Sequence, residues 1–288
     1  MYPLPTDAIL RKTLRTTAAV AGGVMLLIFA FLAIESLPAL RSVGFARFFT
    51  DPSWHPAGGA QVGRFSLTPM LVGTLTAAVG AVLLATPLGI ASALFCAFYA
   101  PPRAGAAYRG LIELLAGIPS VIYGFWGLVV LAPLIRHWQP PGQSLLAGVL
   151  ILSVMILPTV ALLAESSLRS VPRAYLQGAA ALGLSRWATI RGVALPAARS
   201  GIVAAILLAT GRALGETMAV LMVTGNVARV PGSVFDPIRT LTANIALELG
   251  YALDHHRSAL FVSGLLLMVM TVIIVIAAAW SGRRHEHA

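Results

Sequence analysis

Charged side chains are scarce in this chain of 288 residues: 10% of the residues are charged, whereas 58% are hydrophobic. A typical soluble domain carries about 25% charged residues. The composition therefore excludes an ordinary soluble protein and predicts an all-α polytopic membrane protein. The single cysteine, Cys96, lies in an apolar segment, so it excludes an intrachain disulfide and says nothing about redox compartment.

Motifs of nucleotide hydrolysis, ester hydrolysis and metal binding are missing as well. The sequence has no Gly-x-x-x-x-Gly-Lys-Ser/Thr loop, no Gly-x-Ser-x-Gly elbow, and neither the His-Glu-x-x-His nor the paired-cysteine spacing of metal sites. We therefore expect no catalytic residue, no metal site and no cofactor bound by this chain. His285 and His287 are interpreted as solvated residues of the C-terminal tail.

Apolar stretches are abundant, and a helix that crosses a bilayer needs about 20 such residues. Six spans are predicted, at residues 17–35, 68–98, 111–134, 145–165, 201–224 and 259–280. Six spans place both termini on one side of the membrane. The first is interpreted as an uncleaved signal anchor. The second contains Pro87 and Gly89 and is expected to be one tilted or kinked span.

The net charge of +10 comes from basic residues that lie beside the apolar stretches. This distribution fits the positive-inside pattern and argues against a nucleic-acid partner. The loop at residues 166–200 alone holds five arginines, which predicts that this loop and both termini are cytoplasmic. Glu113 and Glu165 then fall near cytoplasmic span ends and are interpreted as interfacial.

An arginine and a glutamate interrupt the fifth apolar stretch. Arg212 and Glu216 are four residues apart, so on one helix they would share a face and neutralise each other. A charge in the hydrocarbon core costs roughly 2.5 to 3.5 kcal/mol on insertion scales, so such residues normally face protein or a water-filled path. A structural ion pair and an anion pathway both fit. We favour the pathway, with Arg212 as the anion contact, Glu216 as its partner when the anion is absent, and Thr217 beside them.

The loop before the fifth span has the pattern of a helical elbow. Pro172 can begin a first helix, Gly183 can adopt the left-handed conformation that ends it, and Ser185 suits the N-cap of a second helix. An apolar face follows at Trp187, Ile190 and Val193. By itself this pattern also fits an amphipathic elbow on a membrane surface.

The spacing in this loop resembles the EAA loop of ABC importer permeases. In that loop a Glu-Ala-Ala triplet is followed by three residues, a glycine, nine residues and Ile-x-Leu-Pro. The corresponding residues here are Gln177, Gly178 and Ala179, then Gly183, then Val193, Leu195 and Pro196. The resemblance implies that residues 177–183 dock into a groove of a cytoplasmic ATPase. Gln177 replaces the acidic residue and can offer an amide hydrogen bond instead.

Two further stretches resemble the phosphate importer permeases of the PstC family. They are residues 118–128, which contain Pro119, Gly124 and Gly127, and residues 211–220 with Gly225 and Asn226 after them. The Met-Ala-Val continuation after Gly-Glu-Thr favours PstC over its sister family PstA. Pro119 predicts a kink, and the two glycines predict close helix packing.

The resemblance implies six transmembrane helices with a MetI-like type I importer core. The implied division is residues 1–66 for the N-terminal tail, first span and periplasmic loop, residues 67–280 for the core, and residues 281–288 for a cytoplasmic tail. It further implies a multi-pass permease of the bacterial inner membrane, in contact with lipid, that is not itself an enzyme. The implied partners are a second permease similar to PstA, a homodimeric ATPase similar to PstB that binds ATP and Mg, and a phosphate-binding protein similar to PstS.

Other functions are also compatible with the sequence. A permease for phosphonate, sulfate or molybdate is the nearest alternative, since selectivity in such systems resides mostly in the binding protein. An ion-driven transporter would be expected to show paired broken helices in two related halves, which the sequence does not indicate. A membrane sensor or scaffold would not need the ATPase-docking loop.

Overall fold

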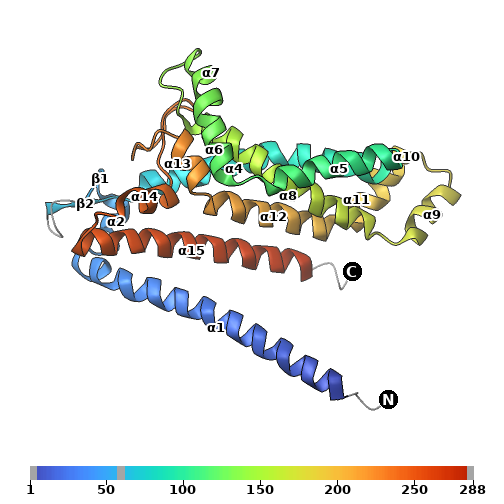
Figure 1. The fold of residues 1–288 in the computed structure, drawn as a ribbon, viewed down its shortest axis with the longest axis horizontal. Helices are drawn as coiled ribbons and strands as arrows, with labels where there is room; N and C mark the ends of the chain where they lie inside the picture. Colours follow the sequence, from blue (N-terminus) through green and yellow to red (C-terminus); the bar gives the residue numbers. More distant parts are fainter. Residues whose placement is uncertain (1–4, 57–61, 284–288) are drawn as a thin grey trace.

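The computed structural model describes residues 5–56 and 62–283 (Figure 1). Most of the predicted C-terminal tail, including His285 and His287, lies outside the described residues. Four helices are long and apolar enough to cross a membrane, within α1 (Pro5–Ser42), α4 (Thr68–Leu94) with its extension, α8 (Leu145–Arg169) and α15 (Asp254–Arg283). Two bent helix pairs bring the number of possible spans to six, the number predicted from the sequence.

The second span is one continuous element, as predicted. Helix α4 contains Pro87 in its interior and continues without a break into the π-helical turn η2 (Phe95–Tyr99). The missing N–H of Pro87 therefore does not split the span. The element ends at Ala100, whose extended backbone precedes Pro101 and Pro102.

The third span, expected at residues 111–134 with a kink at Pro119, is broken there into two separate helices. Helix α5 (Pro102–Gly117) ends before Ile118, which is extended, and α6 (Ser120–Trp126) begins after Pro119. It continues through η3 (Gly127–Leu131) into α7 (Ala132–Arg136), and the two halves meet at 90°. Proline disfavours helical backbone at the preceding residue, which explains why the break lies at Ile118.

The fifth span also differs from the uninterrupted helix expected at residues 201–224. Helix α12 (Arg199–Gly215) ends at Glu216, whose backbone is extended, and α13 (Met218–Val223) begins after Thr217. At its other end α12 meets the preceding helical segment, residues Arg186–Ala197, at 69°. That segment comprises α10 (Arg186–Thr189), the π-helical turn η4 (Ile190–Ala194) and α11 (Leu195–Ala197).

The core of the molecule forms where α4 packs along α8, with α12 and α13 against them. Alanines of α4 and the glycines Gly80 and Gly89 permit this approach: a Cβ at Gly89 would lie 2.7 Å from Val160 of α8. Helix α15 packs on α12, and α1 packs on α15 as an outer layer (Figure 1).

Short elements gather at the two ends of this bundle. One end carries α2 (Arg47–Thr50), the hairpin of β1 (Trp54–His55) and β2 (Arg64–Phe65), and α14 (Leu241–Glu248). The other end carries α9 (Arg173–Ala181) and α10. The N-terminal end of α1 and the C-terminal end of α15 point toward it (Figure 1). We call the first the hairpin end and the second the elbow end.

Candidate functional site

Arg212 lies in the last turn of α12, three residues before the helix ends at Gly215. Its Nη1 donates a hydrogen bond to the hydroxyl of Thr159 on α8, 3.1 Å away. Within the described part of the chain no carboxylate lies within ion-pair distance of this guanidinium. Arg212 is therefore a cation that a neutral group holds in place.

Glu216 does not pair with Arg212, so the expected neutralisation along one helix face is wrong. The i and i+4 side chains meet only if the helix continues, and here it ends at Gly215. The Glu216 carboxylate instead accepts a hydrogen bond from the Ala219 N–H at 3.1 Å, which satisfies a free donor in the first turn of α13. Thr217 bridges the two helices and donates to the Gly215 carbonyl at 3.3 Å.

A hollow of about 720 Å³ opens beside Arg212, between α8, α12 and α15. Its polar lining groups are Arg212, Thr159 and Thr271, and its walls are otherwise small or aliphatic: Ala204, Leu207, Leu208, Gly211, Ile274 and Val275. A cation at the rim of a largely apolar hollow attracts anions and interacts with them more strongly than in bulk water. The arrangement can hold a small oxyanion by the hydrogen-bond donors of Arg212.

The break in the fifth span is supported by α14, a helix that the sequence analysis did not single out. Thr242 donates its hydroxyl to the Glu216 carbonyl at 2.9 Å. At the start of α14, Thr240 caps the helix by accepting from the Ala243 N–H, and the Leu241 N–H donates to the buried hydroxyl of Thr74. One freed carbonyl of the break is thus paired with a neighbouring element, as irregular backbone within a membrane span requires.

The predicted packing residues lie where the two bent spans cross. A Cβ at Gly124 would lie 2.8 Å from the Ala219 Cα, and one at Gly127 would lie 2.7 Å from Val223 and 2.8 Å from Ile151. Pro119 stands at the 90° bend. Without side chains at the two glycines, α6 and η3 lie directly against α13, the helix that follows Glu216.

The elbow has the local geometry that its sequence predicts. Helix α9 follows Pro172, Gly183 adopts a left-handed φ of +70°, and the Ser185 hydroxyl accepts from the Ala188 N–H at 3.2 Å. Gln177 and Gly178 are exposed on α9, whereas Ala179 faces inward. The surface around the turn is apolar, since Leu182 is 81% exposed.

The second part of the elbow anchors it to the bundle. Ile190 and Ala194 are fully buried, and Ala194 belongs to an apolar cluster with residues of α4, α8 and α12. Val193 and Leu195 are half-buried and Pro196 is exposed, while Trp187 faces outward. The exposed α9 and the buried η4 therefore form one element that connects an exposed, partly apolar surface with α12.

Glu165 is buried at the elbow end, so its interpretation as an interfacial residue is wrong. Arg169 donates to its carboxylate at 2.7 Å, and Arg109 lies 3.7 Å away. Arg169 also donates to the Cys96 carbonyl at 3.0 Å, and Arg109 pairs with the exposed Glu113 at 2.9 Å. This network joins α5, α8 and η2 beside the elbow.

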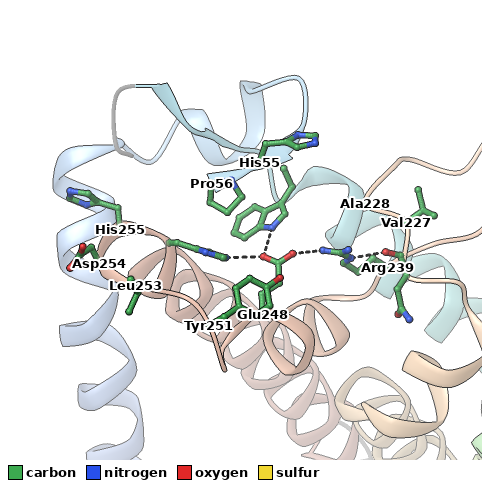
Figure 2. Close-up of a pocket in the computed structure, with 13 residues that line it drawn as sticks. His55, Pro56, Val227, Ala228, Arg239, Glu248, Tyr251, Leu253, Asp254 and His255 are labelled. Atoms are coloured by element: carbon green, nitrogen blue, oxygen red, sulfur yellow. Dashed lines mark hydrogen bonds and ion pairs between the residues drawn. The ribbon is translucent and has the colours of Figure 1, made fainter. Parts of the chain in front are cut away.

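A second polar cluster lies at the hairpin end and surrounds Glu248. Its carboxylate accepts from Arg239 at 2.6 Å and from the Trp54 indole at 2.8 Å, and it contacts His256 Nε2 at 2.8 Å. Arg239 also donates to the carbonyl of Asn226, a residue with a φ of +56°. Figure 2 shows the Glu248 carboxylate facing Arg239 at the floor of an open pocket of about 900 Å³. The Glu248 charge is balanced by Arg239. Through its contacts with Trp54 and His256, the cluster ties the hairpin, α14 and α15 together.

Sequence reasoning missed Thr159, Thr242 and the Glu248 cluster. Isolated threonines in apolar helices carry no signal of their own, because most serve their own helix. The Glu248 cluster joins residues up to 194 positions apart, so only the fold brings them together. A useful signal was available for Glu248, since it is one of only ten acidic residues in the chain.

Comparison with known proteins gives consistent matches over most of the chain. The family model of the binding-protein-dependent transport system inner membrane component matches residues 85–287. The probable ABC transporter permease protein YqgH of Bacillus subtilis is 37% identical over 262 residues, which cover 89% of this chain and 84% of that protein. The phosphate transport system permease protein PstC of Mesorhizobium japonicum is 36% identical, over 96% of this chain and 89% of its own.

Among solved structures, a bacterial ABC transporter involved in the import of the acidic polysaccharide alginate matches with a TM-score of 0.65. At 17% identity over 97% of this chain and 98% of that one, the match shows a shared fold. The chain is a multi-pass membrane protein and belongs to the family of binding-protein-dependent transport system inner membrane components.

Proposed function

We propose that this chain is a permease subunit of an ATP-driven importer of inorganic phosphate. The observation that carries the proposal is Arg212: a cation at membrane depth, without a carboxylate partner among the described residues, on the rim of a 720 Å³ hollow. Such a group is costly in hydrocarbon and useful on an anion path. The similarity to PstC proteins supports phosphate as the anion.

Arg212 suits transient binding of an oxyanion because its planar fork donates two hydrogen bonds to one anion. Between transport events, the Thr159 hydroxyl accepts a hydrogen bond from one N–H of the guanidinium. Since this partner is neutral, an arriving anion has no carboxylate to displace. Glu216, at the break itself, adds negative charge close to the path and favours release. Thr217 sets the distance between the two helices.

The chain itself binds no cofactor in this proposal, and ATP with Mg is held by a separate ATPase dimer. That ATPase docks on α9 through residues 177–183, with the exposed Leu182 as an apolar anchor. A conformational push on α9 reaches α12 through the buried residues of η4.

The elbow end and both termini are then cytoplasmic, and the hairpin end faces the outer phosphate-binding protein. A second, related permease completes the path.

The test is phosphate uptake by the complete transporter with Arg212→Gln. We expect uptake to fall by at least about 100-fold while the complex still assembles, since the substitution removes the charge and retains a polar side chain. Arg41→Gln, at the exposed outer end of α1, is the matched control and should transport normally. Normal uptake by the Arg212 variant would refute the site, and competition by sulfate or molybdate as strong as by phosphate would refute the substrate.

A further inference from the structure

The hydroxyl of Thr159 has a hydrogen to donate. Its oxygen accepts the hydrogen bond from Arg212, because a guanidinium can only donate. In the part of the chain that the structure describes, no group accepts a hydrogen bond from this hydroxyl. The side chain is half-buried and lines the hollow beside Arg212.

Three other helical threonines use the hydroxyl hydrogen within their own helix. Thr210 on α12 and Thr271 on α15 each donate to the carbonyl four residues earlier, at 2.8 and 2.9 Å. The same pattern holds for Thr74 on α4. This backbone contact is the usual role of a threonine in an apolar helix. Thr159 gives up that contact and holds Arg212 instead.

Thr271 provides an internal comparison because it lines the same hollow. Its hydroxyl hydrogen is used within α15, whereas that of Thr159 is free to point into the hollow. Two threonines of similar exposure therefore differ in how the hydroxyl is used: that of Thr159 accepts from Arg212 and keeps its hydrogen available, whereas that of Thr271 donates within its own helix. The difference predicts different consequences for removing each hydroxyl.

We propose that Thr159 is a second contact for the transported oxyanion, oriented by Arg212. The inference rests on the proposed function and adds a residue to its site. Arg212 donates to oxygens of the tetrahedral anion and at the same time keeps the Thr159 oxygen in place, so that the hydroxyl hydrogen is donated to another oxygen of the anion. A neutral donor adds a directed contact without adding a second cation, and the anion is bound weakly enough to leave.

The experiment compares Thr159→Val, Thr159→Ser and Thr271→Val in the complete transporter in proteoliposomes. Phosphate uptake and ATP hydrolysis are measured together at saturating phosphate-loaded binding protein. We expect Thr159→Val to lower the phosphate transported per ATP by about tenfold, the effect of one lost hydrogen bond to a charged group. Thr159→Ser and Thr271→Val should stay within about twofold of the parent protein.

A purely structural role for Thr159 predicts another pattern. Thr159→Val would then lower the thermal stability of the complex and reduce uptake and ATP hydrolysis together. The proposal would be overturned by that result. It would also be overturned by unchanged transport per ATP in Thr159→Val or by an equal loss in Thr271→Val. Arg212→Gln in the same series separates the two hypotheses: if it abolishes uptake while Thr159→Val does not, the inference about Thr159 fails and the proposed function stands.

Discussion

The hydroxyl of Thr242 lies 2.9 Å from the backbone carbonyl of Glu216 and donates a hydrogen bond to it. This contact joins α14 to the break between α12 and α13. The opposite end of α14 carries Glu248, which binds Arg239, Trp54 and His256. One helix of eight residues therefore connects the candidate anion site with the polar cluster at the hairpin end.

Replacing Thr242 with valine removes this contact and leaves the Glu216 carbonyl without a partner. An unsatisfied buried carbonyl costs about 1 to 3 kcal/mol, so we expect a lower melting temperature of the complex and reduced phosphate uptake. Thr76→Val on the exposed face of α4 is the control, because that hydroxyl only serves its own helix. Equal melting temperatures for the two variants would show that the contact has no structural value.

Glu216 is expected to stabilise the fold mainly through its hydrogen bond with Ala219. Glu216→Gln keeps an oxygen that can accept from the Ala219 N–H, whereas Glu216→Ala removes the acceptor and leaves the first turn of α13 uncapped. We therefore expect Glu216→Ala to lower the stability of the complex by about 1 kcal/mol and Glu216→Gln to preserve it, as measured by thermal unfolding. An equal loss in both variants would instead indicate that the negative charge is essential.

Gly124→Ala is expected to separate the two bent spans. The added Cβ would lie 2.8 Å from the Ala219 Cα, a backbone atom that cannot move aside alone. Overpacking of this kind costs about 1 to 3 kcal/mol, so we expect reduced assembly and uptake. Gly110→Ala on α5, where the new Cβ meets no atom within 4 Å, should behave as the parent protein. Normal assembly of Gly124→Ala would contradict the close crossing.

Glu248→Gln leaves Arg239 without its carboxylate. Breaking one side of a buried ion pair costs about 3 to 5 kcal/mol, and Arg239 and Glu248 are both largely buried. We expect a clear drop in the melting temperature of the purified protein. Glu113→Gln serves as a control because its ion pair with Arg109 is exposed, and such pairs contribute at most about 1 kcal/mol. Equal shifts would contradict the structural role of the cluster.

Gly183→Val is expected to uncouple transport from ATP hydrolysis. The left-handed φ of +70° at this position strains any residue with a Cβ, and a β-branched one most. A distorted turn after α9 would change the docking surface without reaching the anion site. ATPase stimulation by the phosphate-loaded binding protein should be lost, while Gly192→Ala, in a helical and open position, should retain it. Unchanged stimulation by Gly183→Val would refute the docking role.

The parts of the fold that depend on local order along the chain were predictable. Long apolar runs specify membrane helices because unpaired backbone groups are too costly in lipid. The elbow was equally readable, since proline, glycine and a capping serine act on their immediate neighbours. Pro119 and Gly183 therefore lie at the bend and the turn that their residue types require.

The relation between Arg212 and Glu216 could not be predicted, because spacing along one helix is informative only while the helix continues. The break at Glu216 is stabilised by Thr242, which is 26 positions away in the sequence. The partner of Arg212 is 53 positions away on another helix. The sequence by itself determined that a cation and a carboxylate lie at membrane depth, since it contains both in an apolar run. Only the tertiary structure decided that they serve different partners, because long-range hydrogen bonds satisfied the broken backbone and separated the two side chains.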